Sequence, residues 1–307
     1  MRTRFFAYLQ MALAMSLAGS SVVVGKIISA KMPVFLISGI SLLLSLLFLI
    51  PFAWRQLTGI RSLSPRNLGI IFMQALTGTV LFRILMLYGI RLTSASAGGL
   101  ITSSGPAVLA ILAFCFLKER PTWNKVLGIF LTVTGLFIIN LQDVDHTGYH
   151  HAWLGSLLIS AAVLGEALFS ILQKKMTQAV SPLASTTLIS FFAFICFLPL
   201  AAKDALGYPF HLLTAKDYFA LVYYGIMVTS VAFILWFSGL NKVPASTAAV
   251  FTSFMPISSL ALACIFLKEP LQWIHFISLS LIVAGILAMT WIQPEKSVQL
   301  ELDTNHS

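Results

Sequence analysis

The sequence predicts an all-helical integral membrane protein with ten transmembrane helices, arranged as two inverted five-helix repeats. Three observations lead to this prediction: the composition, a series of apolar segments along the whole chain, and an internal repeat. Hydrophobic residues make up 58% of the 307 residues and charged residues only 9%, whereas a soluble domain carries about 25% charged residues. Mean hydropathy is +0.93. A water-facing surface needs more charge than this, so soluble enzymes, disordered chains and fibrous proteins are excluded.

The apolar segments are separated by short breaks that carry charged residues. A segment of about 20 residues is long enough to cross a hydrocarbon core. Helices are predicted because lipid offers no hydrogen-bond partners to the backbone, and no alternating barrel pattern is present. The ten predicted spans are Phe6–Ile28, Pro33–Trp54, Asn67–Ile90, Ser94–Leu117, Asn124–Leu141, Ala152–Leu172, Pro182–Ala202, Tyr218–Leu240, Ala245–Leu267 and Trp273–Ile292.

The distribution of basic residues predicts the orientation. Of the 19 Lys and Arg residues, twelve fall on the side that holds the N-terminus, six on the opposite side, and Arg83 lies within a span. Basic residues collect on the cytoplasmic side of membrane proteins, so both termini are predicted to be cytoplasmic in a cell inner membrane. The same bias explains the net charge of +9 without a nucleic-acid partner.

Neither a metal site nor a cofactor site is predicted. The three cysteines lie within apolar segments and are interpreted as small buried hydrophobic residues. The acids and histidines of the segment 143–151 are interpreted as a solvated linker, with metal binding as the alternative. The sequence contains no zincin, serine-hydrolase or P-loop motif.

The internal repeat is the most specific signal. Residues 95–141 and 245–291 match without a gap, with fifteen identical positions among forty-seven. Thr-Ser-x-x-Pro at Thr102 to Pro106 is repeated at Thr252 to Pro256, and Phe-Leu-Lys-Glu occurs in register in both copies. The predicted units are therefore residues 1–151 and 152–292, followed by a short polar cytoplasmic tail at 293–307.

An odd number of spans in each copy inverts the second copy relative to the first. Inverted repeats are typical of secondary transporters, in which the substrate site lies near the membrane midplane between the repeats. The repeats together with the two Lys-Glu turns resemble the EamA-type carriers of the drug/metabolite transporter superfamily. The resemblance covers about residues 6–292. It implies an inner-membrane carrier with a central cavity, commonly an exporter of amino acids, nucleobases or other metabolites.

Two charged residues within spans are candidates for substrate binding or coupling. Glu166 is the one carboxylate well inside a predicted span, and a charge at that depth is costly unless it has a function or a partner. It is predicted either to couple transport to protons or bind a substrate ammonium, or to be a neutral packing residue. Its counterpart in the first repeat is Ser20. Arg83 is predicted either to extend its side chain to the outer interface or to bind a carboxylate or Glu166.

Further candidates are polar or aromatic. Pro106 and Pro256 are predicted to interrupt helical hydrogen bonding near the centres of their spans. The hydroxyls beside them either line the substrate cavity or satisfy the freed carbonyls. Lys26, Tyr88 and Trp236 are gate candidates, with interfacial anchoring as the alternative. The hydroxyl candidates are Thr102, Ser103, Thr252 and Ser253.

The predicted function is secondary active transport of a small metabolite by alternating access, driven either by protons or by exchange of substrates. A passive channel and a membrane-embedded enzyme or lipid-processing protein are the alternatives. The predicted partners are the substrate and the lipid bilayer, and the chain is predicted to be a monomer or a weak homodimer. No enzymatic activity is expected.

Overall fold

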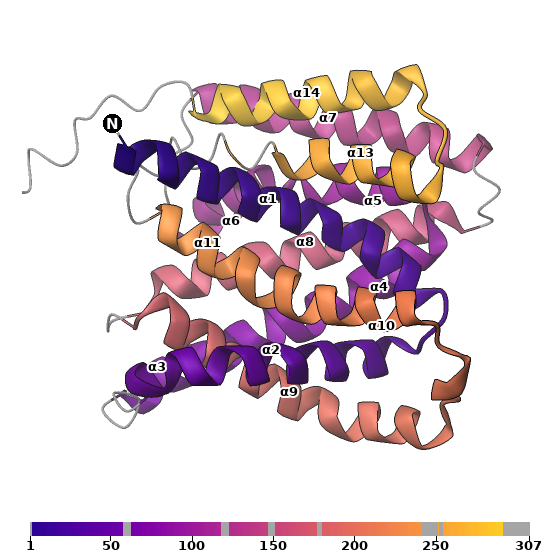
Figure 1. Cartoon of the computed structure of the whole chain (residues 1–307). Coiled ribbons are helices and arrows are strands. Elements are labelled where there is room, and N and C mark those ends of the chain that lie inside the picture. The colour runs from indigo at the N-terminus through magenta and orange to yellow at the C-terminus, as the bar shows by residue number, and fades with distance from the viewer. Residues whose placement is uncertain are drawn as a thin grey trace, which may run out of the picture.

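A computed structural model describes residues 2–57, 63–117, 123–146, 151–176, 180–240, 251 and 254–290, and every regular element in these ranges is helical. Figure 1 shows a bundle of helices that run roughly parallel to a common axis. The uninterrupted helices are α1 (Arg2–Ser29), α2 (Val34–Leu57), α7 (Trp123–His146), α8 (Ala152–Lys174), α9 (Pro182–Gly207), α13 (Phe254–Leu267) and α14 (Trp273–Thr290).

Seven helical segments in the described ranges are long and apolar enough to cross a membrane. Three further apolar helices, at Val126–Gly135, Phe254–Leu267 and Trp273–Ala288, are shorter than that requirement. The predicted class, an all-helical membrane protein, is therefore confirmed for the described residues. Helix α7 continues past the predicted end of its span at Leu141 as far as His146.

Two predicted spans contain a π-helical segment at matching places in the two halves. One comprises α3 (Pro65–Gln74), the π-helix η2 (Ala75–Leu81) and α4 (Phe82–Leu92). Its counterpart comprises α10 (Ala215–Tyr223), the π-helix η4 (Tyr224–Val231) and α11 (Ala232–Leu240), preceded by the 3-10 turn η3 (Phe210–Leu212). Such π segments are rare and occur frequently at functional sites.

The fourth predicted span is two helices rather than one. Helix α5 (Ala95–Thr102) ends three residues before α6 (Gly105–Leu117) begins. Pro106 is the second residue of α6, where a missing N–H costs nothing because the first turn has no intrahelical acceptor for it. Pro106 therefore lies at a break between two helices rather than within one continuous helix. Pro256 likewise lies in the first turn of the described helix α13.

Hydroxyl caps fix where several helices begin. The side chain of Ser94 accepts a hydrogen bond from the backbone N–H of Ala97 at 3.0 Å and so caps α5. Ser181 caps α9 in the same way, with Pro182 at the first helical position. Such a cap satisfies a backbone donor that has no partner within its own helix.

Helices of the two halves pack in exchanged pairs. Helix α1 packs against α11 and α13, and α8 packs correspondingly against α4 and the α5–α6 segment. Helix α2 packs against η4, and α9 against η2. The remaining pairs join equivalent helices, α2 with α9 along one side of the bundle and α7 with α14 along the other (Figure 1). Each contact therefore has a counterpart in which the halves exchange roles.

Glycines allow the close approach at these crossings. A Cβ atom on Gly155 of α8 would lie 2.8 Å from the carbonyl oxygen of Gly89 in α4. At the corresponding crossing of α11 with α1, a Cβ atom on Gly239 would lie 3.0 Å from the carbonyl oxygen of Ala7. Small residues at such contacts let helix backbones approach closely within a membrane.

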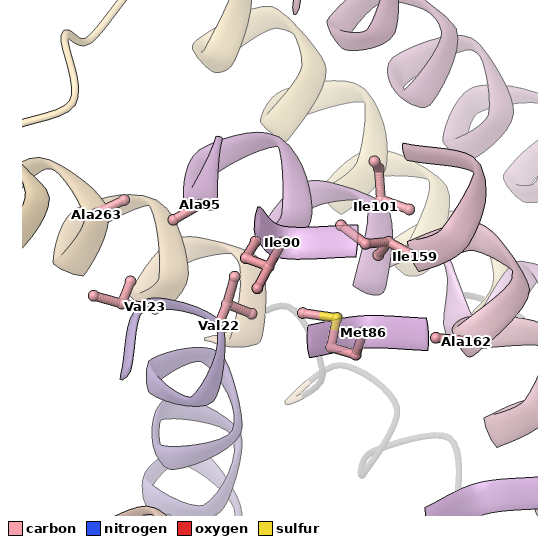
Figure 2. Packing of buried hydrophobic residues seen from close by; sticks show 9 residues of the cluster. All are labelled: Val22, Val23, Met86, Ile90, Ala95, Ile101, Ile159, Ala162 and Ala263. Atoms are coloured by element: carbon pink, nitrogen blue, oxygen red, sulfur yellow. The ribbon is translucent and has the colours of Figure 1, made fainter. Parts of the chain in front are cut away.

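One buried cluster joins both halves near the start of α5. Figure 2 shows its members on α1, α4, α5, α8 and α13, with Ala95 lying toward Ala263 and Ile90 between neighbouring helices. These apolar side chains pack beside the first turn of α5, and the charged groups that reach this turn, Lys26 and Glu269, are only partly exposed.

Candidate functional site

Glu166 is exposed although it lies on the buried face of α8. Ile159 and Ala162, seven and four residues before it, share its helical face and are fully buried. The exposed residues Leu157 and Leu164 lie on the opposite face. Glu166 therefore differs from these neighbours, because its side chain is accessible while theirs are buried. No hydrogen bond or ion pair of the Glu166 carboxylate occurs among the described residues, so the predicted partnership with Arg83 is not formed.

Ser20, the counterpart of Glu166 in the first half, is 5% exposed. Its hydroxyl lies 2.8 Å from the Tyr223 hydroxyl and donates to the carbonyl of Leu17 at 2.6 Å. Position 20 of α1 thus contacts the α10 helix of the second half, whereas the equivalent carboxylate of α8 is left accessible.

Arg83 is buried in the bundle, with 7% of its surface exposed. Its two terminal nitrogens donate to the hydroxyls of Ser41 and Thr229, each at 2.7 Å. The guanidinium carbon also lies 5.4 Å from the centre of the Tyr224 ring, within the range of a cation–π contact. The alternative in which Arg83 extends to the outer interface is therefore wrong. The side chain instead joins α2 and α4 of the first half to η4 of the second.

The surroundings of Arg83 are rich in hydroxyls from α2 and η4. Ser38, Ser41 and Ser45 follow one face of α2 and are all fully buried. The hydroxyl of Ser45 bonds to that of Ser230 at 2.8 Å, and Ser41 donates to the carbonyl of Ser38 at 3.1 Å. Thr229 donates to the carbonyl of Tyr224, five residues earlier, at 2.8 Å. We use the name Arg83 cluster for Arg83, Tyr224 and these hydroxyl residues, which are Ser38, Ser41, Ser45, Thr229 and Ser230.

Lys26 takes part in a contact between the halves at the end of the bundle away from the N-terminus. Its ammonium lies 3.4 Å from the Glu269 carboxylate and donates to the carbonyl of Thr93 at 2.6 Å. Glu269 also accepts from the backbone N–H groups of Ala95 and Ser96, at 2.8 and 2.9 Å. The Ser96 hydroxyl donates to the same carboxylate at 2.6 Å. Glu269, in the turn before α14, thus caps the first turn of α5.

The backbone and the charges together favour an ionised Glu269. Its burial alone would raise the pKa, but the hydrogen bonds from Ser96 and Ala95 and the charge of Lys26 hold the pKa below the usual value of 4.5. A negative charge at a helix N-terminus is further stabilised by the helix dipole. Lys268, directly before Glu269, adopts a left-handed conformation with φ of 54°.

A second ion pair joins the halves at the same end. The ammonium of Lys31, after α1, lies 2.7 Å from the Asp217 carboxylate in the first turn of α10. Asp217 also accepts from the backbone N–H and the hydroxyl of Thr214, at 2.8 and 2.7 Å. Both ion pairs found in the described ranges therefore connect the first half to the second at this end.

Two of the three gate candidates line one surface hollow. Lys26 and Tyr88 contribute to a hollow of about 820 Å³, together with Lys31, Arg91 and Asp204. The Tyr88 ring lies 5.6 Å from the Arg91 guanidinium carbon. Trp236 lies on α11 and is partly buried. The hollow is at the same end as the two ion pairs.

The hydroxyls at the α5–α6 break bond to local carbonyls. Thr102 and Ser103 both donate to the carbonyl of Gly99, at 2.9 and 2.7 Å, and Ser104 donates to that of Ile101 at 2.7 Å. These three side chains therefore satisfy the interrupted helix in this conformation. A substrate-lining role for them stays a prediction. Thr252 and Ser253 lie outside the described residues, and Pro256 is buried.

Several residues of these sites were not singled out from the sequence. The internal repeat could have indicated three of them, because Glu269, Ala95 and Ser96 are identical to their counterparts in the other copy. Ser41 and Thr229 gave no comparable signal, since hydroxyls are common in apolar spans. Their proximity to Arg83 depends on how α2, α4 and η4 pack.

A sequence model of the EamA-like transporter family matches residues 5–141 and again residues 153–291. The chain belongs to the EamA-like transporter family. The two matches divide it almost where the internal repeat does. Several of its relatives are also described as transporters or as an exporter.

An uncharacterized transporter, YetK, from Bacillus subtilis (strain 168) is 38% identical over 91% of this chain and 85% of its own. A probable terminal-alkyne amino-acid exporter from Streptantibioticus cattleyicolor is 21% identical over 75% of each chain. A solved crystal structure superposes with a TM-score of 0.62 at 16% identity, covering 93% of this chain and 96% of the other. That likeness shows the fold.

Proposed function

We propose that this EamA-like transporter is a secondary active exporter of small metabolites, such as amino acids or nucleobases, and works by alternating access. The observation that carries the proposal is the exchanged packing of the two halves around buried polar groups. Site residues between repeats and rocking of one repeat against the other are typical of secondary transporters. The relative described as an amino-acid exporter supports the direction and the class of substrate.

Ten spans in two inverted repeats form the proposed architecture. The matched π segments, the exchanged helix pairs and the double family match support it. The first repeat ends near residue 151 and the second near residue 292. Both termini are then cytoplasmic in a cell inner membrane, and the chain works as a monomer or a weak homodimer.

The two ion pairs form the proposed outer gate. Lys26 with Glu269 and Lys31 with Asp217 each hold a helix of one half to a segment of the other. Breaking both pairs would free the halves to separate at that end. The conformation described is then closed to the outside, with Lys26 and Tyr88 at the mouth of the closed pathway.

Glu166 is the proposed proton-coupling residue. Its side chain is exposed and has no partner among the described residues, and in the proposed mechanism it exchanges protons with water that enters from one side. The equivalent position in the first repeat is Ser20, which is not an acid. The fold of a repeat therefore does not require a carboxylate at this position.

The proposal predicts that Glu166→Gln abolishes proton-linked flux. Gln keeps the size and polarity of the side chain but has no carboxyl group that binds and releases a proton. Proteoliposomes loaded with individual labelled amino acids or nucleobases, under an imposed pH gradient, measure the effect. We expect the variant to lose the acceleration by the gradient while it keeps exchange of labelled against unlabelled substrate.

Glu166→Asp is the matched control, because it keeps a titratable group and should retain part of the gradient response. Gradient-dependent flux of Glu166→Gln equal to that of the wild type would contradict the coupling role. Stimulation of efflux by substrate on the opposite side distinguishes a carrier from a passive channel.

A further inference from the structure

The Arg83 cluster contains a buried positive charge that no described carboxylate neutralises. Arg83 is 7% exposed, and its described polar partners are the neutral hydroxyls of Ser41 and Thr229 and the face of Tyr224. Hydroxyls and a ring lower the energy of the ion without balancing its charge. A charge retained within a membrane span is costly and is by default a sign of function.

The cluster also contains a spare hydrogen-bond donor. The hydroxyl of Ser38 is fully buried and has no hydrogen-bond partner in the part of the chain that the structure describes. It lies one helical turn before Ser41 on the same face of α2, so it belongs to the hydroxyl row beside Arg83. Burying a hydroxyl without a partner destabilises the protein, because the group has lost its hydrogen bonds to water. A ligand oxygen that accepts from Ser38 would remove that cost.

We infer that the Arg83 cluster binds the carboxylate of the transported metabolite. This inference rests on the proposed function and names the chemical class of its substrate. The planar fork of a guanidinium matches the two oxygens of a carboxylate. On binding, the carboxylate replaces the Ser41 and Thr229 oxygens as the acceptor of the two terminal nitrogens, and Ser38 donates a further hydrogen bond.

The charge of the cluster selects a carboxylate over a phosphate. Arg83 is the one cation in the cluster as the structure describes it, and a single positive charge balances a single negative charge. A phosphate near neutral pH carries about −1.5 to −2 charges, so it would leave negative charge buried.

The cluster also spans the two halves, since Ser38 and Ser41 belong to the first and Thr229 to the second.

Ligand discrimination by the wild-type chain is the first test. Thermal unfolding of the purified full chain in detergent is measured with each of a panel of amino acids, its amide, its decarboxylated amine, and inorganic phosphate. We expect at least one amino acid to raise the unfolding temperature, with its amide, its amine and phosphate giving no comparable shift. Equal shifts from acid and amide, or no carboxylate-dependent shift across the panel, would overturn the inference.

Three variants locate the binding. Arg83→Gln should abolish the shift, and Arg83→Lys should weaken apparent affinity about tenfold because it keeps the charge but loses the fork. Ser38→Ala removes a hydroxyl that has no partner, so it should fold at least as well as the wild type and bind several-fold more weakly. Ser21→Ala, whose hydroxyl donates to the carbonyl of Ala18, is the control and should bind like the wild type.

Variants that fold can also overturn the inference, so the test does not depend on variants that fail to fold. Unchanged acid binding by the folded Ser38→Ala and Arg83→Lys variants would overturn it. Failure of the proposed function can be distinguished from failure of the carboxylate site, because the binding assay needs no pH gradient. Carboxylate binding without gradient-dependent flux removes the coupling proposal alone, whereas transport of amides at the rate of acids removes the carboxylate site alone.

Discussion

Glu269 connects the two halves through a single carboxylate. It bonds to two backbone N–H groups and one hydroxyl of α5 and pairs with Lys26 of α1. The side chain is 15% exposed, so water screens these contacts only in part. Its contribution to stability therefore depends on its ionisation.

We predict that Glu269→Gln unfolds at a lower temperature than the wild type at pH 7. The amide offers one acceptor oxygen where the carboxylate offers two, so a donor at the start of α5 loses its partner, at a cost of about 1–3 kcal/mol. Because the folded pKa of Glu269 lies below 4.5, the wild-type advantage is complete above that pH. It is lost as the pH falls through the folded pKa.

Thermal unfolding of both proteins between pH 7 and pH 3 checks this prediction. The difference in unfolding temperature should shrink in the acid range. A difference that stays constant down to pH 3 would show that ionisation of Glu269 does not stabilise the fold.

The sequence indicated the depth of single residues but not their direction. Arg83 could be recognised as unusual because it interrupts an apolar segment. The sequence did not decide whether its side chain extends to the outer interface or lies in the interior. The choice depends on the hydroxyls of Ser41 and Thr229, which come from helices far apart in the sequence. Glu166 was likewise recognisable by depth, and only the burial of its neighbours shows that it faces inward.

The crossing of α4 and α8 is an element-scale contact between the halves. Gly89 and Gly155 each face the carbonyl oxygen of the other, and a Cβ atom on either would lie within 3.0 Å of it. Since backbone atoms form both sides of this contact, a larger side chain cannot be accommodated by rotating a neighbour. The helices would have to separate.

We predict that Gly155→Val destabilises the protein by about 1–3 kcal/mol, the usual cost of overpacking a filled interior. Gly69→Val is the matched control, because no atom of the described residues lies within 4 Å of a Cβ atom at that position in α3. Thermal unfolding in detergent compares the two variants with the wild type. Equal stability of Gly155→Val and Gly69→Val would contradict the close crossing.

Element positions followed well from hydropathy, but interruptions within elements did not. The apolar segments locate the helices because the membrane requires long apolar stretches with satisfied backbones. The π segments depend instead on tertiary contacts such as that of Gly225 with the carbonyl of Ser41, where a Cβ atom would lie at 2.8 Å. A break between α5 and α6 was signalled by Pro106, although the residues where the helices end were not.

At the scale of the whole molecule, alternating access requires the halves to separate where the ion pairs now hold them. We predict that a cross-link between positions 26 and 269 stops transport. The variant combines Lys26→Cys and Glu269→Cys with replacement by alanine of Cys115, Cys196 and Cys264. A reducible bifunctional thiol reagent forms the link.

Exchange of labelled against unlabelled substrate in proteoliposomes measures the effect. It should fall after cross-linking and recover after reduction, and each single cysteine variant treated with the same reagent should keep its rate. Full exchange in the cross-linked protein would contradict separation at this end.

The π segment η2 leaves its span with a surplus residue relative to a continuous α-helix. The π winding takes up this extra residue within its own turns, because its hydrogen bonds run from residue i to residue i+5. If all the residues of Ala75–Leu81 wound as an ordinary α-helix, everything beyond them would turn by about 100°. Arg83 lies only two positions past the segment, so its guanidinium would then swing away from Ser41 and Thr229. The direction of this buried cation is therefore set by a local irregularity of winding.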